Sequence, residues 1–185
     1  DPSSLSDDQV TALYQDQDGV LWIGTGGGGL DRFDRENERF IHYQHDPDDP
    51  NSPSSNAVSS IYGEQEGELW IGTDGGGLNT FDPVTEQFTR YQHDPENPHS
   101  LSSDSVWEIY EDRDDVLWMG TYWGGGLHKF DRETEQFTRY EPNPDDPDAL
   151  WMEEGINVIY EDKEGLFWIG TAGGGLNLFD RKTET

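Results

Sequence analysis

The chain has 185 residues and a formal net charge of −29, because 40 aspartates and glutamates face only 11 lysines and arginines. Nucleic acids and anionic membranes bind basic surfaces, so this composition excludes both as expected partners. There is no cysteine to form a disulfide, and no apolar stretch of the roughly 20 residues that membrane insertion requires. We therefore expect a soluble domain or a mature fragment. The acidic excess also suggests a halophilic source, where salt screens self-repulsion.

One pentapeptide, Leu21-Trp22-Ile23-Gly24-Thr25, returns three times along the chain. Its later copies are Leu69–Thr73, Leu117–Thr121 and Phe167–Thr171, and the four tryptophans are 48, 48 and 50 residues apart. Each copy continues into a glycine cluster, a leucine and a Phe-Asp pair. A period of this length, filled with short apolar runs, is typical of propeller blades.

Each copy contains short runs of β-branched and aromatic residues between Gly, Asp and Pro clusters. In the first copy the runs are Val10–Tyr14, Leu21–Thr25, Leu30–Phe33 and Phe40–Tyr43. Such runs predict strands, and none has the length or the 3.6-residue period of a helix. The sequence thus predicts an all-β fold, a whole or partial β-propeller of four-stranded antiparallel blades. The four blades are expected at residues 6–47, 54–95, 102–142 and 152–185.

The turn between the first two strands closes with a glycine in three copies, at Gly19, Gly67 and Gly165. Glycine readily adopts the left-handed conformation that a tight hairpin needs. The third copy has Asp115 at this position, which tolerates that conformation less well.

The fourth copy reaches Thr185 before the run that would form its outer strand. Its third strand is then expected to be an open edge, which proteins normally pair or cover. Two alternatives remain for the cover: the remaining blades of a longer parent chain, or a second copy. Two four-bladed chains would make an eight-bladed ring with two-fold symmetry, so we expect a homodimer.

The full repeat can be written Val-x-x-Ile-Tyr-x-Asp-x-x-Gly-x-Leu-Trp-Ile-Gly-Thr-x-Gly-Gly-Gly-Leu-x-x-Phe-Asp, with His-Asp-Pro-x-x-Pro-x-Ser-Leu-Ser between copies. This pattern resembles the two-component regulator propeller repeat. The resemblance implies a sensor β-propeller in signal transduction, periplasmic or extracellular, placed before a membrane helix and a histidine kinase or diguanylate cyclase. It also implies a glycan or another small solute as ligand. This chain itself carries no kinase and no membrane helix.

No catalytic, metal or cofactor site stands out from the sequence. The glycine clusters lie between strands, so they lack the helix N-terminus that a phosphate-binding loop uses. Asp16-x-Asp18-Gly19 suggests a calcium loop, but the pattern changes in the other copies and an acidic turn is the simpler interpretation. The five histidines have no metal-ligand spacing. We expect a protein that is not an enzyme.

Three tryptophans break the repeat and mark a candidate binding surface: Trp107, Trp123 and Trp151. The other four occupy the repeated second-strand position and are expected to pack blades together. The turn after strand two, the crossover after strand four and the start of strand one emerge at the same end of a blade. Aromatic residues with a polar rim, on loops of a rigid scaffold, suit a neutral solute such as an oligosaccharide. The predicted ligand-binding residues are Trp107, Tyr122, Trp123, Trp151, Glu108, His128, Glu153 and Glu154.

The same aromatic residues admit two other interpretations. They can pack on another protein, which makes the chain an assembly module with no small ligand, or they can fill local space. A saturable response to a small solute separates the first interpretation from these two.

Overall fold

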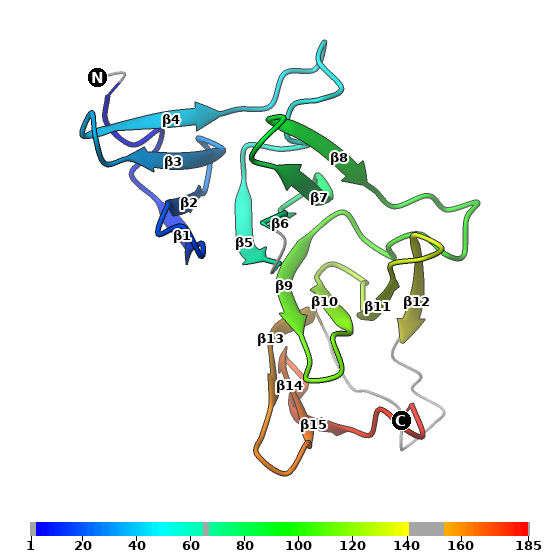
Figure 1. Cartoon of the computed structure of the whole chain (residues 1–185). Coiled ribbons are helices and arrows are strands. Elements are labelled where there is room, and N and C mark those ends of the chain that lie inside the picture. The colour runs from blue at the N-terminus through cyan, green and yellow to red at the C-terminus, as the bar shows by residue number, and fades with distance from the viewer. Residues whose placement is uncertain (1–2, 65–66, 141–153, 185) are drawn as a thin grey trace. The chain divides into compact units, whose positions relative to one another are not determined.

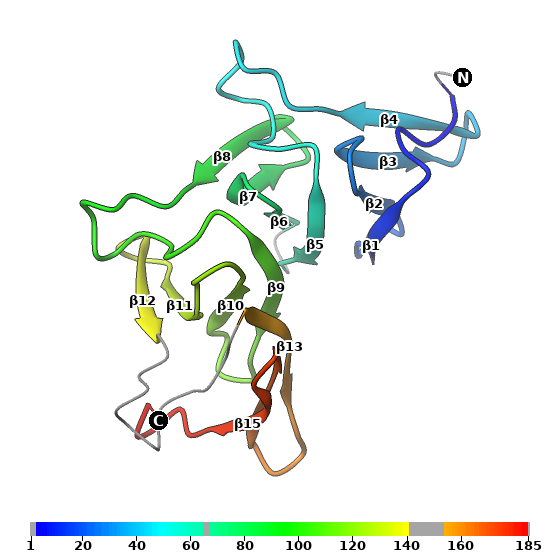
Figure 2. The same ribbon diagram turned by 180° about the vertical axis from the view of Figure 1, so that it is seen from behind.

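The computed structural model describes residues 3–64, 67–140 and 154–184. These residues form antiparallel β-sheets and contain no helix. The chain divides into two units, Asp1–Gln92 and His93–Thr185, which are described one at a time. Figures 1 and 2 show the strands of each sheet following one another in chain order.

The first unit contains blade one and blade two, each a four-stranded meander. The strands of blade one are β1 (Val10–Gln15), β2 (Leu21–Thr25), β3 (Leu30–Asp34) and β4 (Arg39–Tyr43). Those of blade two are β5 (Val58–Gly63), β6 (Leu69–Thr73), β7 (Gly77–Asp82) and β8 (Gln87–Tyr91). The first strands, β1 and β5, lie side by side in both views.

The second unit contains blade three and blade four. Blade three consists of β9 (Val106–Glu111), β10 (Leu117–Thr121), β11 (Leu127–Asp131) and β12 (Gln136–Tyr140). Blade four consists of β13 (Gly155–Glu161), β14 (Phe167–Ala172) and β15 (Gly175–Phe179), a three-stranded sheet in the part of the chain that the structure describes. The predicted strands are therefore confirmed in all four copies.

The core of each unit lies between its two blades. Trp22 of blade one packs edge-on against Phe81 of blade two, with ring centroids 5.5 Å apart. In the second unit Trp118 of blade three lies 5.1 Å from Phe167 of blade four. The side chains of Trp22 and Trp118 are almost completely buried. The prediction that the repeated tryptophans pack blades together is confirmed at these two positions.

An acidic residue in the first hairpin holds the indole of each repeated tryptophan. Trp22, Trp118 and Trp168 donate their Nε1–H groups to Asp16, Asp112 and Asp162 at 2.8–2.9 Å, and Trp70 donates to Glu64 at 2.7 Å. A buried indole N–H needs such an acceptor. The repeated acidic residue of the turn therefore serves the core, and the calcium interpretation of Asp16 is not needed.

The hairpins close as the glycines predict. Gly19, Gly67 and Gly165 have φ values of 80°, 95° and 83°. Asp115 adopts the same left-handed conformation, with φ 59°, although its side chain makes it more costly.

The threonine of the pentapeptide shapes the glycine cluster. In blade one the Thr25 hydroxyl donates to the Gly29 carbonyl at 3.0 Å and accepts from the Gly28 N–H at 3.0 Å. In blade three the Thr121 hydroxyl makes both bonds with one glycine: it donates to the Gly126 carbonyl at 3.1 Å and accepts from the Gly126 N–H at 2.9 Å. The cluster is a structural turn, as predicted.

Candidate functional site

Three aromatic side chains of blade three form one surface in the second unit. Trp107 projects from the first strand, β9, and Tyr122 and Trp123 come from the turn between β10 and β11. The rings of Trp107 and Tyr122 lie 4.7 Å apart, and those of Tyr122 and Trp123 lie 6.0 Å apart. The sequence prediction that these residues gather at one end of the blade agrees with this placement. We call them the aromatic surface.

Trp123 is held in an exposed and strained position. Its φ is 58°, in the left-handed region that a bulky residue rarely adopts, and its side chain is 66% exposed. Its N–H donates to the Glu154 carbonyl at 2.8 Å, which fixes the backbone. Blade four has a glycine, Gly173, in its corresponding turn, with φ 86°. Strain of this kind persists where the surroundings impose it, and it is common at binding sites.

Tyr122 links the aromatic surface to blade four. Its N–H donates to the Ser105 carbonyl at 2.9 Å, and its hydroxyl donates to Oδ1 of Asn157 on β13. Tyr122 also forms a bridge with Gly155. Glu154 adjoins this bridge with an exposed side chain, so a carboxylate is available at the rim.

Glu108 follows Trp107 on β9, and Trp107 is the extra residue of a β-bulge, because Val106 pairs with Thr121 and Glu108 with Gly120. Its carboxylate accepts a long hydrogen bond, 3.4 Å, from the Ile159 N–H of blade four. Burial raises the pKa of Glu108 to about 7, against a usual value of 4.5. The residues at the same position of the other copies are small or apolar (Ala12, Ser60 and Val158), so this half-buried carboxyl is peculiar to blade three.

His128 occupies a different place from the one the sequence suggested. Its side chain is completely buried in blade three, and its Nε2 accepts hydrogen bonds from the Ser102 N–H at 3.0 Å and hydroxyl at 2.9 Å. In the first unit Asp31 likewise accepts from the N–H and the hydroxyl of Ser6. Asn79 accepts from the Ser54 N–H but donates its own amide N–H to the Ser54 hydroxyl. Burial, together with the charge of Arg139, lowers the pKa of His128 to about 3. We therefore assign His128 to the fold of its blade and leave it out of the binding surface.

Two of the predicted site residues, Trp151 and Glu153, lie outside the described residues. Within the described ranges, no group of three or more histidine, aspartate or glutamate side chains is arranged to hold a metal ion. No helix in the described part of the chain is long and apolar enough to cross a membrane.

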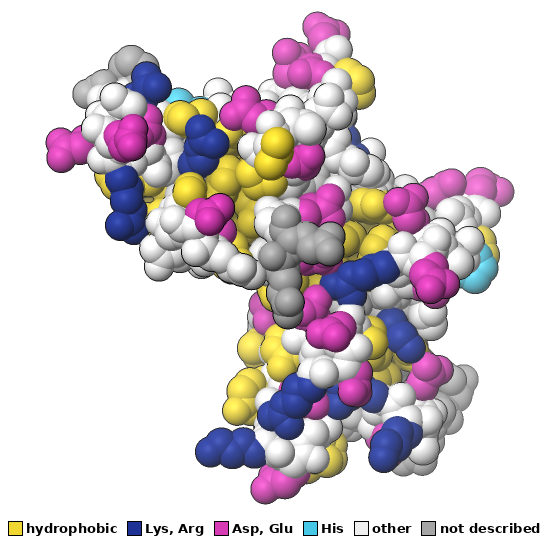
Figure 3. All heavy atoms as spheres, in the orientation of Figure 1, with side chains coloured by type: hydrophobic (Ala, Val, Ile, Leu, Met, Phe, Trp, Pro, Cys, Tyr) yellow, Lys and Arg dark blue, Asp and Glu magenta, His cyan; other side chains and the backbone are white. Residues whose placement is uncertain are grey.

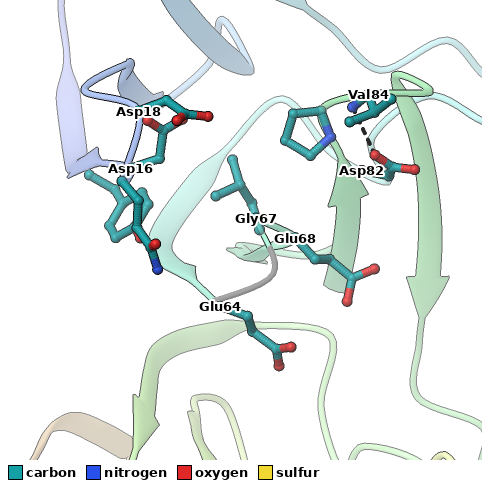
Figure 4. Close-up of a pocket in the computed structure, with 11 residues that line it drawn as sticks. Asp16, Asp18, Glu64, Gly67, Glu68, Asp82 and Val84 are labelled. Carbon is teal, nitrogen blue, oxygen red and sulfur yellow. Dashed lines mark hydrogen bonds between the residues drawn. The ribbon is translucent and has the colours of Figure 1, made fainter.

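A second candidate site, which the sequence analysis did not single out, is an acidic groove in the first unit. It lies between blade one and blade two and has a volume of about 630 Å³. Figure 4 shows three chain segments around it: the first hairpin of blade one, the first hairpin of blade two and the turn after β7. Its carboxylates are Asp16, Asp18, Glu64, Glu68 and Asp82. A sequence signal for this groove does exist. The Phe-Asp pair is followed by arginine in three copies and by Pro83 in the second copy alone.

The four meander blades define a repeat protein of the β-propeller class. Four segments match the model of the family described as two component regulator propeller: residues 4–27, 52–75, 100–123 and 150–173. These segments make up just over half of the chain, and the chain belongs to this family. The resemblance stated from the repeat pattern is thus confirmed.

Solved structures of sensor domains are similar to this chain in sequence and in fold. The chain is 29% identical to the extracellular domain assigned to a hybrid two component system of B. thetaiotaomicron, with a TM-score of 0.74. The match covers 98% of this chain and 30% of that domain. It is 25% identical to the extracellular domain assigned to a one component system of the same organism, with a TM-score of 0.73, covering 98% of this chain and 24% of that one. The chain therefore spans less than a third of the length of these neighbours.

A more distant neighbour shows the fold alone. Virginiamycin B lyase from Staphylococcus aureus is 13% identical, with a TM-score of 0.64, and the match covers 98% of this chain and 59% of the lyase. A comparison with curated protein sequences found no match.

Proposed function

We propose that the chain is a non-catalytic recognition module of a periplasmic or extracellular sensor, and that its aromatic surface binds a small neutral solute such as an oligosaccharide. The observation that carries this proposal is Trp123. A tryptophan held at φ 58° and left 66% exposed contributes little to the packing of its blade. The tilted ring pair of Trp107 and Tyr122 lies beside it.

The chemistry of the surface suits a sugar better than an ion. Ring faces of tryptophan and tyrosine stack on the C–H faces of a pyranose, and the Glu154 carboxylate and Asn157 amide are positioned to accept and donate hydrogen bonds to hydroxyl groups. The net charge of −29 disfavours anionic ligands. The neighbours are extracellular domains assigned to signalling systems, which supports a sensing role at the cell surface.

Titration calorimetry with a panel of neutral oligosaccharides tests the proposal. We expect saturable binding to one member of the panel, quenching of tryptophan fluorescence, and loss of binding in Trp123→Gly and in Trp107→Thr, which introduces the residue of blade one. The control is Tyr160→Ser, which removes an exposed aromatic side chain of blade four outside the aromatic surface. Binding that survives both tryptophan substitutions contradicts the proposed site.

A second candidate function, assembly with another protein, is favoured by the free face of blade four. Figure 3 shows hydrophobic side chains at the surface of this sheet. Leu176 is 68% exposed, whereas its counterparts Leu30 and Leu127 are completely buried between blades. Leu178, which stands where the earlier copies have Arg32, Thr80 and Lys129, is 52% exposed. Exposed leucines of this kind mark an interaction surface.

The occupant that we propose for this face is blade one of a second copy. Its Leu13 is exposed, whereas Ile159, at the same position of blade four, is buried against blade three. Light scattering of the 185-residue chain should then give about 42 kDa, twice the 21.0 kDa mass. Leu178→Asp should return it to a monomer. A monomer in the unsubstituted chain leaves this face to further blades of a longer protein and contradicts the dimer.

A further inference from the structure

The acidic groove of the first unit has a counterpart in the second unit that contains a cation. Between blade three and blade four, the Arg181 guanidinium lies against carboxylates of both blades. Nη1 is 2.5 Å from Oδ2 of Asp112 and 3.8 Å from Oδ2 of Asp114, and Nη2 is 2.7 Å from Oε1 of Glu161. Nη2 also donates to the Gly165 carbonyl at 3.4 Å. In the second groove an arginine of the chain itself thus pairs with the carboxylates of both blades.

Most partners of Arg181 are repeated in the first unit. Asp16 corresponds to Asp112, Asp18 to Asp114 and Gly67 to Gly165, each at the same place in its hairpin. The correspondence extends to hydrogen bonding. Asp16 accepts from the Val20 N–H and the Trp22 indole, as Asp112 does from Val116 and Trp118.

The first unit has no arginine at the position of Arg181. Pro83 stands at the position of Arg181, and none of the described residues that line the acidic groove is a lysine or an arginine. Arg132, in the same position of blade three, also binds a carboxylate, Glu111, at 2.6 Å. Both arginines of the second unit at this position are therefore paired, and blade two alone has an uncharged residue there.

The remaining difference concerns the third carboxylate. Gly63 replaces Glu161 in the first unit, but Glu68 and Asp82 line the same groove, and Glu68 replaces the apolar Leu166. Figure 4 shows the side chains of Asp16 and Asp18 on one side of the groove and those of Glu64, Glu68 and Asp82 around the rest. Carboxylates that share one groove repel one another, and a cation between them removes that cost.

We propose that the acidic groove between blade one and blade two is a binding site for a guanidinium group supplied from outside the chain. The planar fork of a guanidinium matches a carboxylate pair in a way that an ammonium does not, and Arg181 shows the arrangement in the second unit. Two sources present this group: an arginine side chain of a partner protein and a small guanidino solute. The site is separate from the aromatic surface, which belongs to the second unit.

Titration calorimetry and amide NMR shifts with agmatine and putrescine test the proposal. Both ligands are dications, but only agmatine has a guanidinium, so their comparison removes the general attraction of an acidic protein. We expect agmatine to bind about tenfold more tightly than putrescine, with shifts at Asp18 and Gly67. Equal affinities, or shifts spread over the whole acidic surface, overturn the proposal.

Three variants locate the site. Pro83→Arg places the repeat's own arginine in the groove, so it should abolish agmatine binding and raise Tm. Asp18→Asn with Glu68→Gln should weaken agmatine binding about tenfold or more, through lost charge-assisted hydrogen bonds. The control Asp114→Asn changes the charge beside the occupied groove of the second unit and should leave agmatine binding unaltered. Unchanged binding in Pro83→Arg and in the double variant overturns the proposal.

Peptides distinguish the two sources. A short peptide with one arginine between glycines is compared with its lysine counterpart. If the arginine peptide binds more tightly than agmatine, the natural ligand is an arginine of a protein. If agmatine binds and the peptide does not, it is a small solute. Both results support a guanidinium site, whereas equal binding of the arginine and lysine peptides contradicts it.

Discussion

Replacing Trp118 tests whether the repeated tryptophans hold the blades together. The side chain is 2% exposed, and its ring lies between 5.1 and 5.9 Å from those of Phe167, Phe179 and Tyr140. Truncation of a core aromatic to alanine costs about 3–5 kcal/mol of the free energy of unfolding. The lost indole hydrogen bond adds only about 1 kcal/mol, because Asp112 keeps its bonds to Val116, Asp114 and Arg181. We expect Trp118→Ala to cost about 4–6 kcal/mol in all.

Two further variants divide this cost. Trp118→Phe keeps a ring in the contact but removes the indole donor, so it should cost about 1–3 kcal/mol. Trp123→Ala removes an exposed ring, with no packing between blades, and should cost less than about 1 kcal/mol. The difference between the losses in Trp118→Ala and Trp123→Ala then measures how much the packing of the repeated tryptophan contributes to the free energy of unfolding.

Equilibrium urea unfolding, followed by circular dichroism, measures these free energies from the midpoint and the slope of each transition. Similar slopes in all the variants show that the same surface is exposed on unfolding. Equal losses in Trp118→Ala and Trp123→Ala would refute the division into packing residues and surface residues.

Three other predictions concern pH and salt. Burial raises the pKa of Glu108 to about 7, above its usual 4.5, so the free energy of unfolding should fall as pH rises through this window. Glu108→Gln should remove that fall in urea titrations at several pH values, whereas Glu154→Gln should keep it. For His128 the folded pKa of about 3 lies below the usual 6.5, so stability should fall as pH decreases through this range. His128→Asn, the residue of blade two at this position, should keep the bond to Ser102 and flatten that decline; an unaltered acid profile contradicts it. With a net charge of −29, Tm should rise between roughly 0.05 and 2 M KCl, and a flat Tm counts against a halophilic source.

The sequence alone was sufficient for the blades, because the signals that define them are local and repeat four times. Strand runs, hairpin glycines and the pentapeptide each act within about ten residues, so the pattern predicts a blade without knowledge of its neighbours. The positive φ of Asp115 also followed from its place in the hairpin. The bond from the repeated turn carboxylate to Trp22 and its counterparts was not predicted, although both residues recur at constant spacing.

The aromatic surface was only partly accessible from the sequence. The ends of a meander place Trp107, Tyr122 and Trp123 together, and the structure shows their rings in contact. The same reasoning included His128, because topology gives the strand end but not the face to which a side chain points. The tertiary structure decided that point: the imidazole is buried and holds Ser102.

The acidic groove shows what packing of one blade on the next determines. Asp16 and Asp18 are far in sequence from Glu68 and Asp82, and they face one groove only because β1 packs beside β5. Whether carboxylates repel, pair or bind a cation depends on distances of a few ångströms across that contact, since Coulomb interactions fall with separation and are screened by water. The repeat therefore determined how each blade folds, and the packing between blades determined which of its charges meet.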